Sequence, residues 1–135
     1  MSKENWAEKS SNDMSLCVAN GNWEIYKDGE GVKDVYFNGE SIRSLPSAYY
    51  QISVYSGGAL LWTPSTERNK YFFMFDNSAK QIFELNGKNI SMEIDEPVIT
   101  FYDSINNEKV EVAMFDFNSF EQISLEKDGQ IGFNF

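Results

Sequence analysis

The sequence predicts an all-β protein, on three observations. From Leu16 to Phe135 the apolar residues recur mostly at every second position, in short runs rich in Val, Ile, Tyr and Phe. Gly, Asn, Asp and Ser separate these runs, as turn residues separate strands. No stretch carries the sustained apolar stripe of an amphipathic helix. We therefore expect about ten short antiparallel strands. The candidate strands are residues 22–27, 33–37, 49–55, 59–63, 70–76, 80–85, 88–94, 97–102, 109–115, 120–126 and 130–134.

The chain begins with a segment of different character. Residues 1–15 are polar and aperiodic apart from Trp6, so we expect a flexible N-terminal arm there. A chain of 135 residues fits one domain, and we place a single all-β domain over residues 16–135. Within that domain, Gly57-Gly58 is expected to form a hairpin turn.

A short motif repeats along the strands. Met74-Phe75-Asp76-Asn77-Ser78 resembles Met114-Phe115-Asp116-Phe117-Asn118-Ser119, and Val35-Tyr36-Phe37-Asn38-Gly39 is a fainter copy. Asn38-Gly39, Asn86-Gly87 and Asp128-Gly129 suit type I′ turns, so each copy is expected to close a tight hairpin. These glycines recur at about the length of a four-stranded propeller blade, roughly 40 to 50 residues. We expect three hairpin-based repeats in an open stack resembling part of a β-propeller, with a β-sandwich as the alternative.

The composition excludes most catalytic chemistry. The chain contains no histidine and a single cysteine, Cys17, which removes His-dependent nucleophile pairs and the usual zinc sites. The adjacent carboxylates Asp95 and Glu96 do not fit a glycosidase pair, because neighbours on a strand point to opposite faces and Pro97 indicates a turn. We therefore expect no catalytic residues, no metal site and no cofactor.

Charge is concentrated in one quarter of the sequence. The net charge is −10, and between Glu93 and Glu126 nine carboxylates stand against one base, Lys109. Such a surface disfavours nucleic acid and anionic membranes as partners and favours a basic protein. The first residues do not read as a secretory signal, and no apolar run is long enough to span a membrane, so we expect a cytoplasmic protein.

Strand alternation indicates where these acids point. If the strands are sequential antiparallel neighbours, Glu93, Asp95, Lys109 and Glu111 share an outer face. The residues expected to face inward are Ile90, Met92, Ile94, Val110, Val112 and Met114. Either Phe101 or Tyr102 is expected on the outer face, since their parities differ. The candidate partner-binding residues are Glu93, Asp95, Glu96, Phe101, Tyr102, Asp103, Glu108, Glu111 and Asp116.

In overall profile the chain resembles the small cytosolic immunity proteins of bacterial toxin systems, including contact-dependent growth inhibition. The resemblance rests on chain length, the acids from Glu93 to Glu126 and the missing histidine. It implies a tight complex with a basic cognate toxin domain, often a nuclease, whose active site the acidic face covers. No functional position is carried over from the family.

Two other functions fit the sequence. A carbohydrate- or small-ligand-binding β-domain would use Trp62 and the tyrosines. A scaffold or assembly subunit would pair edge strands, for example through Gly132-Phe133-Asn134-Phe135.

Overall fold

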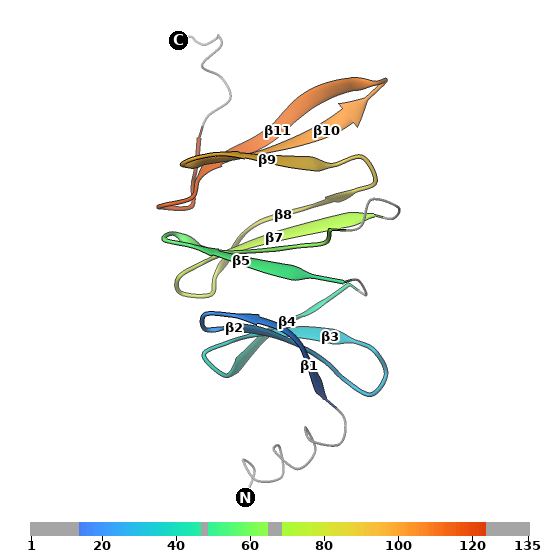
Figure 1. Cartoon of the computed structure of the whole chain (residues 1–135), viewed down its shortest axis with the longest axis vertical. Coiled ribbons are helices and arrows are strands. Elements are labelled where there is room, and N and C mark those ends of the chain that lie inside the picture. The colour runs from blue at the N-terminus through green and yellow to red at the C-terminus, as the bar shows by residue number, and fades with distance from the viewer. Residues whose placement is uncertain (1–13, 47–48, 65–68, 124–135) are drawn as a thin grey trace, which may run out of the picture.

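The computed structural model describes residues 14–46, 49–64 and 69–123. These residues form twelve strands in three four-stranded antiparallel sheets, and the described part of the chain contains no helix. Figure 1 shows the three sheets stacked one above another, in chain order, along the long axis. The all-β prediction is confirmed, and so is the open stack of three repeats in place of a two-sheet sandwich.

Each sheet is a meander of four consecutive strands. The first sheet contains β1 (Ser15–Asn20), β2 (Trp23–Lys27), β3 (Lys33–Phe37) and β4 (Glu40–Leu45). The second contains β5 (Gln51–Tyr55), β6 (Gly58–Trp62), β7 (Lys70–Asp76) and β8 (Gln81–Gly87). The third contains β9 (Ser91–Asp95), β10 (Val98–Ile105), β11 (Glu108–Asp116) and β12 (Glu121–Gln122), and its order is β12-β11-β10-β9.

The second sheet is buried on both faces. On β7, Phe73 and Phe75 pack into the core shared with the first sheet, whereas Phe72 and Met74 pack into the core shared with the third. This burial explains why β6 and β7 are almost continuously apolar, where a sheet with one exposed face would alternate. The outer sheets each have one face that no other sheet covers (Figure 1).

The sequence repeat corresponds to a structural repeat. Its three copies occupy the ends of β3, β7 and β11, the third strand of each sheet, and Phe37, Asp76 and Asp116 are the last residues of those strands. The registers of β3–β4 and β7–β8 shift at matching positions, after Val35 and after Met74. Asp76 and Asp116 also act alike, since each carboxylate accepts a hydrogen bond from the backbone amide two residues ahead, at 2.9 and 2.8 Å.

One predicted turn is wrong. Asn38 and Gly39 have φ of 54° and 83°, as a type I′ turn requires. Gly87 instead ends β8, and the chain continues into β9 of the next sheet without closing a hairpin. A Cβ at Gly87 would lie 3.1 Å from the Ile90 side chain, so this glycine provides room for packing. Asp128-Gly129 lies outside the described residues.

Two strands were not predicted. Strand β1 shares only Ser15 with the expected N-terminal arm, whose residues 1–13 lie outside the described residues. It lies at a sheet edge and its residues are mostly exposed, so it has no apolar alternation to detect. Strand β4 contains Arg43, whose guanidinium lies 4.7 Å from the Phe73 ring centroid and donates to Gln81 at 2.8 Å. The range 120–126 contains only the short β12 before the described residues end, and 130–134 lies outside them.

The hairpin turn expected at Gly57-Gly58 lies one residue earlier, at Ser56-Gly57, and connects β5 to β6, whose first residue is Gly58. The amide of Gly57 donates to the Phe117 carbonyl at 3.0 Å, which ties the second sheet to the third. No helix of the described part of the chain is long and apolar enough to cross a membrane.

Candidate protein-binding face

The third sheet brings the acids of three strands onto one surface. Thr100 of β10 pairs with Glu93 on one side and Met114 on the other, while Tyr102 pairs with Ser91 and Glu111. Directly paired residues share a face, and the opposite face carries Ile99, Phe101, Ala113 and Phe115, which are buried against the second sheet. The uncovered side is here called the outer face. Its residues are Ser91, Glu93, Asp95, Val98, Thr100, Tyr102, Lys109, Glu111, Met114, Asp116 and Glu121.

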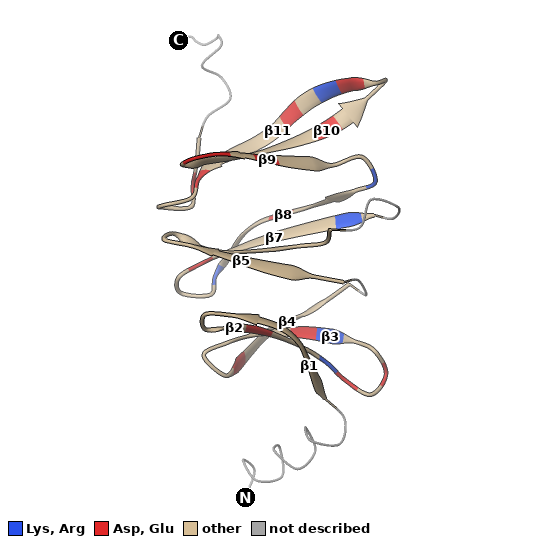
Figure 2. Cartoon of the chain, in the orientation of Figure 1, with Lys and Arg blue, Asp and Glu red and all other residues tan. Residues whose placement is uncertain are grey.

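The outer face is strongly acidic. It carries five carboxylates (Glu93, Asp95, Glu111, Asp116, Glu121) and one lysine, Lys109. Lys109 forms an ion pair with Glu93, and the hydrogen bond that its ammonium donates to this carboxylate raises the pKa of Lys109. Among the described residues no cation pairs with Asp95 or Glu111, and both are exposed. Figure 2 shows red acidic segments on β9 and β11 and a blue basic segment on β11.

Tyr102 is the aromatic residue of this face. Its side chain is half-buried, and the Lys109 ammonium lies 4.5 Å from its ring centroid. Phe101 is fully buried, with ring centroids of Phe72 and Phe83 both 5.2 Å away. The prediction that Phe101 binds a partner was therefore wrong, because the parity of its strand directs this side chain into the core. The sequence did not decide which of Phe101 and Tyr102 faces outward, and in the structure Tyr102 does.

Strand β11 contains a bulge, which changes the predicted alternation of its side chains between the two faces of the sheet. Phe101 pairs with Ala113, yet the next residue, Tyr102, pairs with Glu111, so Val112 is an extra residue. Lys109 and Glu111 consequently face outward, as predicted. The inward prediction was wrong for Val112, which is the extra residue of the bulge and is 36% exposed, and for Met114, which lies half-buried on the outer face. Val110 pairs with Asp103 and so has the expected inward parity, although it is 41% exposed, and Ala113 and Phe115 occupy the core.

The inward predictions hold for Ile90, which is buried just before β9, and for Met92 of β9, which packs against the core shared with the second sheet. Ile94 pairs with buried Ile99 and so has the expected parity. It is nevertheless 45% exposed, because β9 is an edge strand.

The other candidate residues lie apart from the central acids. Asp103 shares the parity of Phe101, and its carboxylate accepts a hydrogen bond from the Ser104 amide at 2.8 Å. Glu108 lies at the tip of the β10–β11 hairpin, whose turn residues are Asn106 and Asn107. The structure also places Glu96 in the turn between β9 and β10, and Asp116 at the end of β11, where it caps the following turn. Of the predicted set, the outer face therefore groups Glu93, Asp95, Tyr102, Glu111 and, at its edge, Asp116, and does not include Glu96, Phe101, Asp103 or Glu108.

The β10–β11 hairpin also carries exposed apolar residues, which were not predicted from the sequence. Strand β9 pairs only with Val98–Tyr102, so the rest of the β10–β11 hairpin extends past it. Ile105 and Val110 are exposed on this extension, on the side of the hairpin shared by Phe101 and Asp103, and Val112 is exposed at the bulge opposite Tyr102. The extension was missed because β10 and β11 contain eight and nine residues, against six and seven in the expected ranges 97–102 and 109–115.

In the described part of the chain, no group of three or more His, Cys, Asp or Glu side chains is arranged to hold a metal ion. No protein-family model matches the chain, and no curated protein matches its sequence. Its function is therefore argued from the geometry of the outer face and its surroundings.

Proposed function

We propose that the chain is a non-catalytic binding protein whose outer face binds a basic protein partner. One observation carries this proposal. Val35, Met74 and Met114 occupy the same repeat position and point the same way along the stack. Val35 and Met74 are fully buried by the next sheet, whereas Met114 lies half-buried on a surface bordered by Glu93 and Glu111. In the third sheet, the face that corresponds to the packing faces of the first two sheets is therefore an acidic surface.

The charge of this face supports a partner of opposite sign. Like charges directly opposite each other on neighbouring strands destabilise a sheet, and Asp116 of β11 pairs directly with Glu121 of β12. A cation bound at this face would relieve that repulsion and would also neutralise Asp95 and Glu111, with which no described cation pairs. A one-signed surface also steers an oppositely charged protein and can raise its association rate to roughly 10⁸ to 10⁹ M⁻¹s⁻¹ at low salt. A basic partner accounts for both properties.

Apolar groups beside the acids support a lasting complex. Tyr102 is half-buried on the outer face with the Lys109 ammonium 4.5 Å from its ring centroid, and Val112 is exposed at the adjoining bulge. Buried aromatic and aliphatic anchors slow dissociation, whereas rim charges mainly accelerate association. The combination fits a protein partner and disfavours a polyanion.

Within this proposal the partner is a cognate toxin domain, most simply a nuclease with a basic cleft. Glu93, Asp95 and Glu111 would imitate the phosphate charge that such a cleft binds and would exclude its substrate. The chain would then act as a cytoplasmic immunity protein of the contact-dependent growth inhibition type.

The proposal is tested by affinity capture from a lysate of the source cell, with a low-salt wash followed by salt and then denaturant. We expect one basic protein, retained in stoichiometric amount until the denaturant step. Expressed alone, this protein should be toxic, and the purified chain should inhibit its activity at a one-to-one ratio. Failure of the chain to inhibit the captured protein would contradict neutralisation, and recovery of no basic protein would contradict the binding proposal itself.

A further inference from the structure

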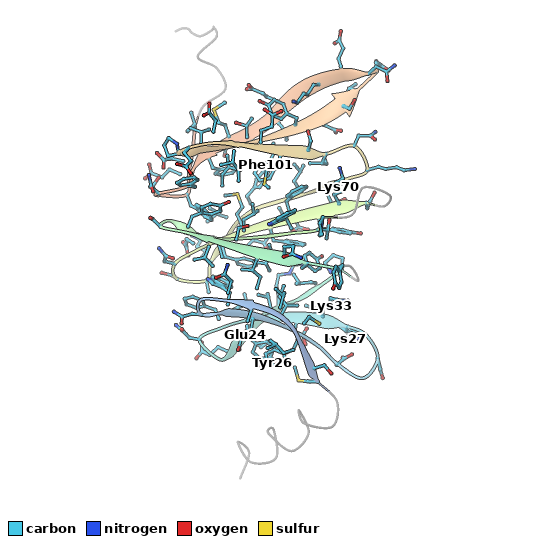
Figure 3. The ribbon with its side chains drawn as sticks, in the orientation of Figure 1. Glu24, Tyr26, Lys27, Lys33, Lys70 and Phe101 are labelled. Atoms are coloured by element: carbon cyan, nitrogen blue, oxygen red, sulfur yellow. The ribbon has the colours of Figure 1, made fainter. Side chains whose placement is uncertain are left out.

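A pocket lies between the second and third sheets, and none of the outer-face carboxylates lines it. Its volume is about 180 Å³, and its walls include Trp62, Lys70, Phe72, Ser91 and Met92. These residues come from the end of β6, the start of β7 and the start of β9. Figure 3 labels Lys70 at the edge of the stack, on the second sheet, and Phe101 above it in the third.

The apolar walls of this pocket are held in place. The indole nitrogen of Trp62 donates to the Ser53 hydroxyl at 3.0 Å, which fixes the orientation of its ring. Phe72 is 3% exposed and packs edge to face on Phe101, with ring centroids 5.2 Å apart. Because an apolar cavity of roughly 150 Å³ accepts benzene, a pocket of this size has room for a single ring.

Two hydrogen-bond donors accompany these walls. Lys70 donates to the Ile90 carbonyl at 2.8 Å, which holds its ammonium in position, and no described residue offers it a carboxylate. Thr63 also lines the pocket and is 3% exposed. Its hydroxyl oxygen accepts from the Tyr71 amide at 2.9 Å, and within the described ranges no group accepts the hydroxyl proton. A cation and a hydroxyl donor beside an apolar slot match a ligand with a flat apolar body and an anionic end.

We propose that this pocket binds an aromatic carboxylate, with the ring against Trp62 and Met92 and the carboxylate at Lys70 and Thr63. The ligand is either a free aromatic acid or the C-terminal aromatic residue of a peptide, because both present the same ring and carboxylate. This inference does not rest on the proposed function, since none of the outer-face carboxylates lines the pocket.

The test is a titration of the ¹⁵N-labelled full chain with phenylacetate, followed by amide chemical shifts. We expect saturable shifts at Tyr71, Ser91 and Met92, with a dissociation constant in the millimolar range for a ligand of this size. Phenylacetamide, the neutral analogue, should bind at least about tenfold more weakly, because it lacks the charge-assisted hydrogen bond. Equal binding of the two compounds, or no saturable shift at these amides, would overturn the proposal.

Variants locate the site. Lys70→Gln should weaken phenylacetate binding by about tenfold or more, and Thr63→Val by a smaller factor, while Lys80→Gln, at an exposed lysine in the β7–β8 turn, makes the same charge change as a control. Unchanged binding by Lys70→Gln, or an equal loss in Lys80→Gln, would refute the assignment. A phenylalanine-terminated peptide and its C-terminal amide separate the two sources. Tighter binding of the free-carboxylate peptide than of phenylacetate identifies a peptide terminus, and weaker binding identifies a free acid.

Discussion

Replacing Phe101 tests whether its side chain stabilises the core or binds a partner. Its ring is fully buried and lies within 5.2 Å of both Phe72 and Phe83 and 6.2 Å of Phe115, measured between centroids. A buried Phe→Ala substitution costs about 3 to 5 kcal/mol of unfolding free energy. We expect Phe101→Ala near the upper end of that range, since three aromatic contacts disappear with the ring.

The expected loss is measurable by urea unfolding followed by far-UV circular dichroism. With a urea dependence of roughly 2 kcal/mol per M, a loss of about 4 kcal/mol lowers the midpoint by about 2 M. Phe101→Leu should lose less than about 1.5 kcal/mol, because most of the volume is retained. The neighbouring Tyr102→Ala is the matched control and should leave stability within about 1.5 kcal/mol of the parent. A cost below about 1 kcal/mol for Phe101→Ala would refute the packing described between the second and third sheets.

Three further predictions concern turns and surface charge. Gly58→Ala places a Cβ 2.0 Å from the Phe75 carbonyl oxygen, so we expect a loss of several kcal/mol in thermal unfolding, and a parent-like melting temperature would contradict the close approach. Asp76→Ala removes two backbone hydrogen bonds and should cost about 1 to 2 kcal/mol in urea unfolding, whereas an effect below about 0.3 kcal/mol would show that the turn does not need this cap. Glu93→Gln breaks an exposed ion pair that solvent screens, so the melting temperature should stay that of the parent within error; a clear drop in melting temperature would assign the pair a structural role.

Strand alternation predicted the fold well where burial was consistent along a strand. Strands β3 and β7 begin and end at the expected residues, because each carries a clear apolar pattern through to the repeated motif. Strand β1 was missed because an edge strand with exposed residues leaves no periodic signal. Asn86-Gly87 was misassigned because a glycine needed for close packing looks the same in sequence as a glycine needed for positive φ.

The outer face was predictable in part. The parity of Glu93 and Asp95 followed from the apolar pattern of their strand, and the sequential order of β9, β10 and β11 brought Glu111 beside them. The bulge at Val112 could not be read from the sequence, because an extra residue in an otherwise alternating strand leaves no compositional mark. The pocket at Lys70 and Trp62 was equally hidden, since it forms between residues of different sheets.

The outer face is tested most directly by reversing its charge. Two triple variants change the net charge by the same amount. The outer-face variant carries Glu93→Lys, Asp95→Lys and Glu111→Lys, and the control variant carries Glu30→Lys, Asp34→Lys and Glu40→Lys. The control residues lie on the first sheet and its β2–β3 turn. The measurement is the association rate of each variant with the captured basic partner, by surface plasmon resonance at low salt and at about 0.5 M salt. We predict near-parent association for the control and loss of binding for the outer-face variant, with parent association slowing as salt rises. Parent-like binding by the outer-face variant would contradict the account and leave these acids as the polar end of the stack.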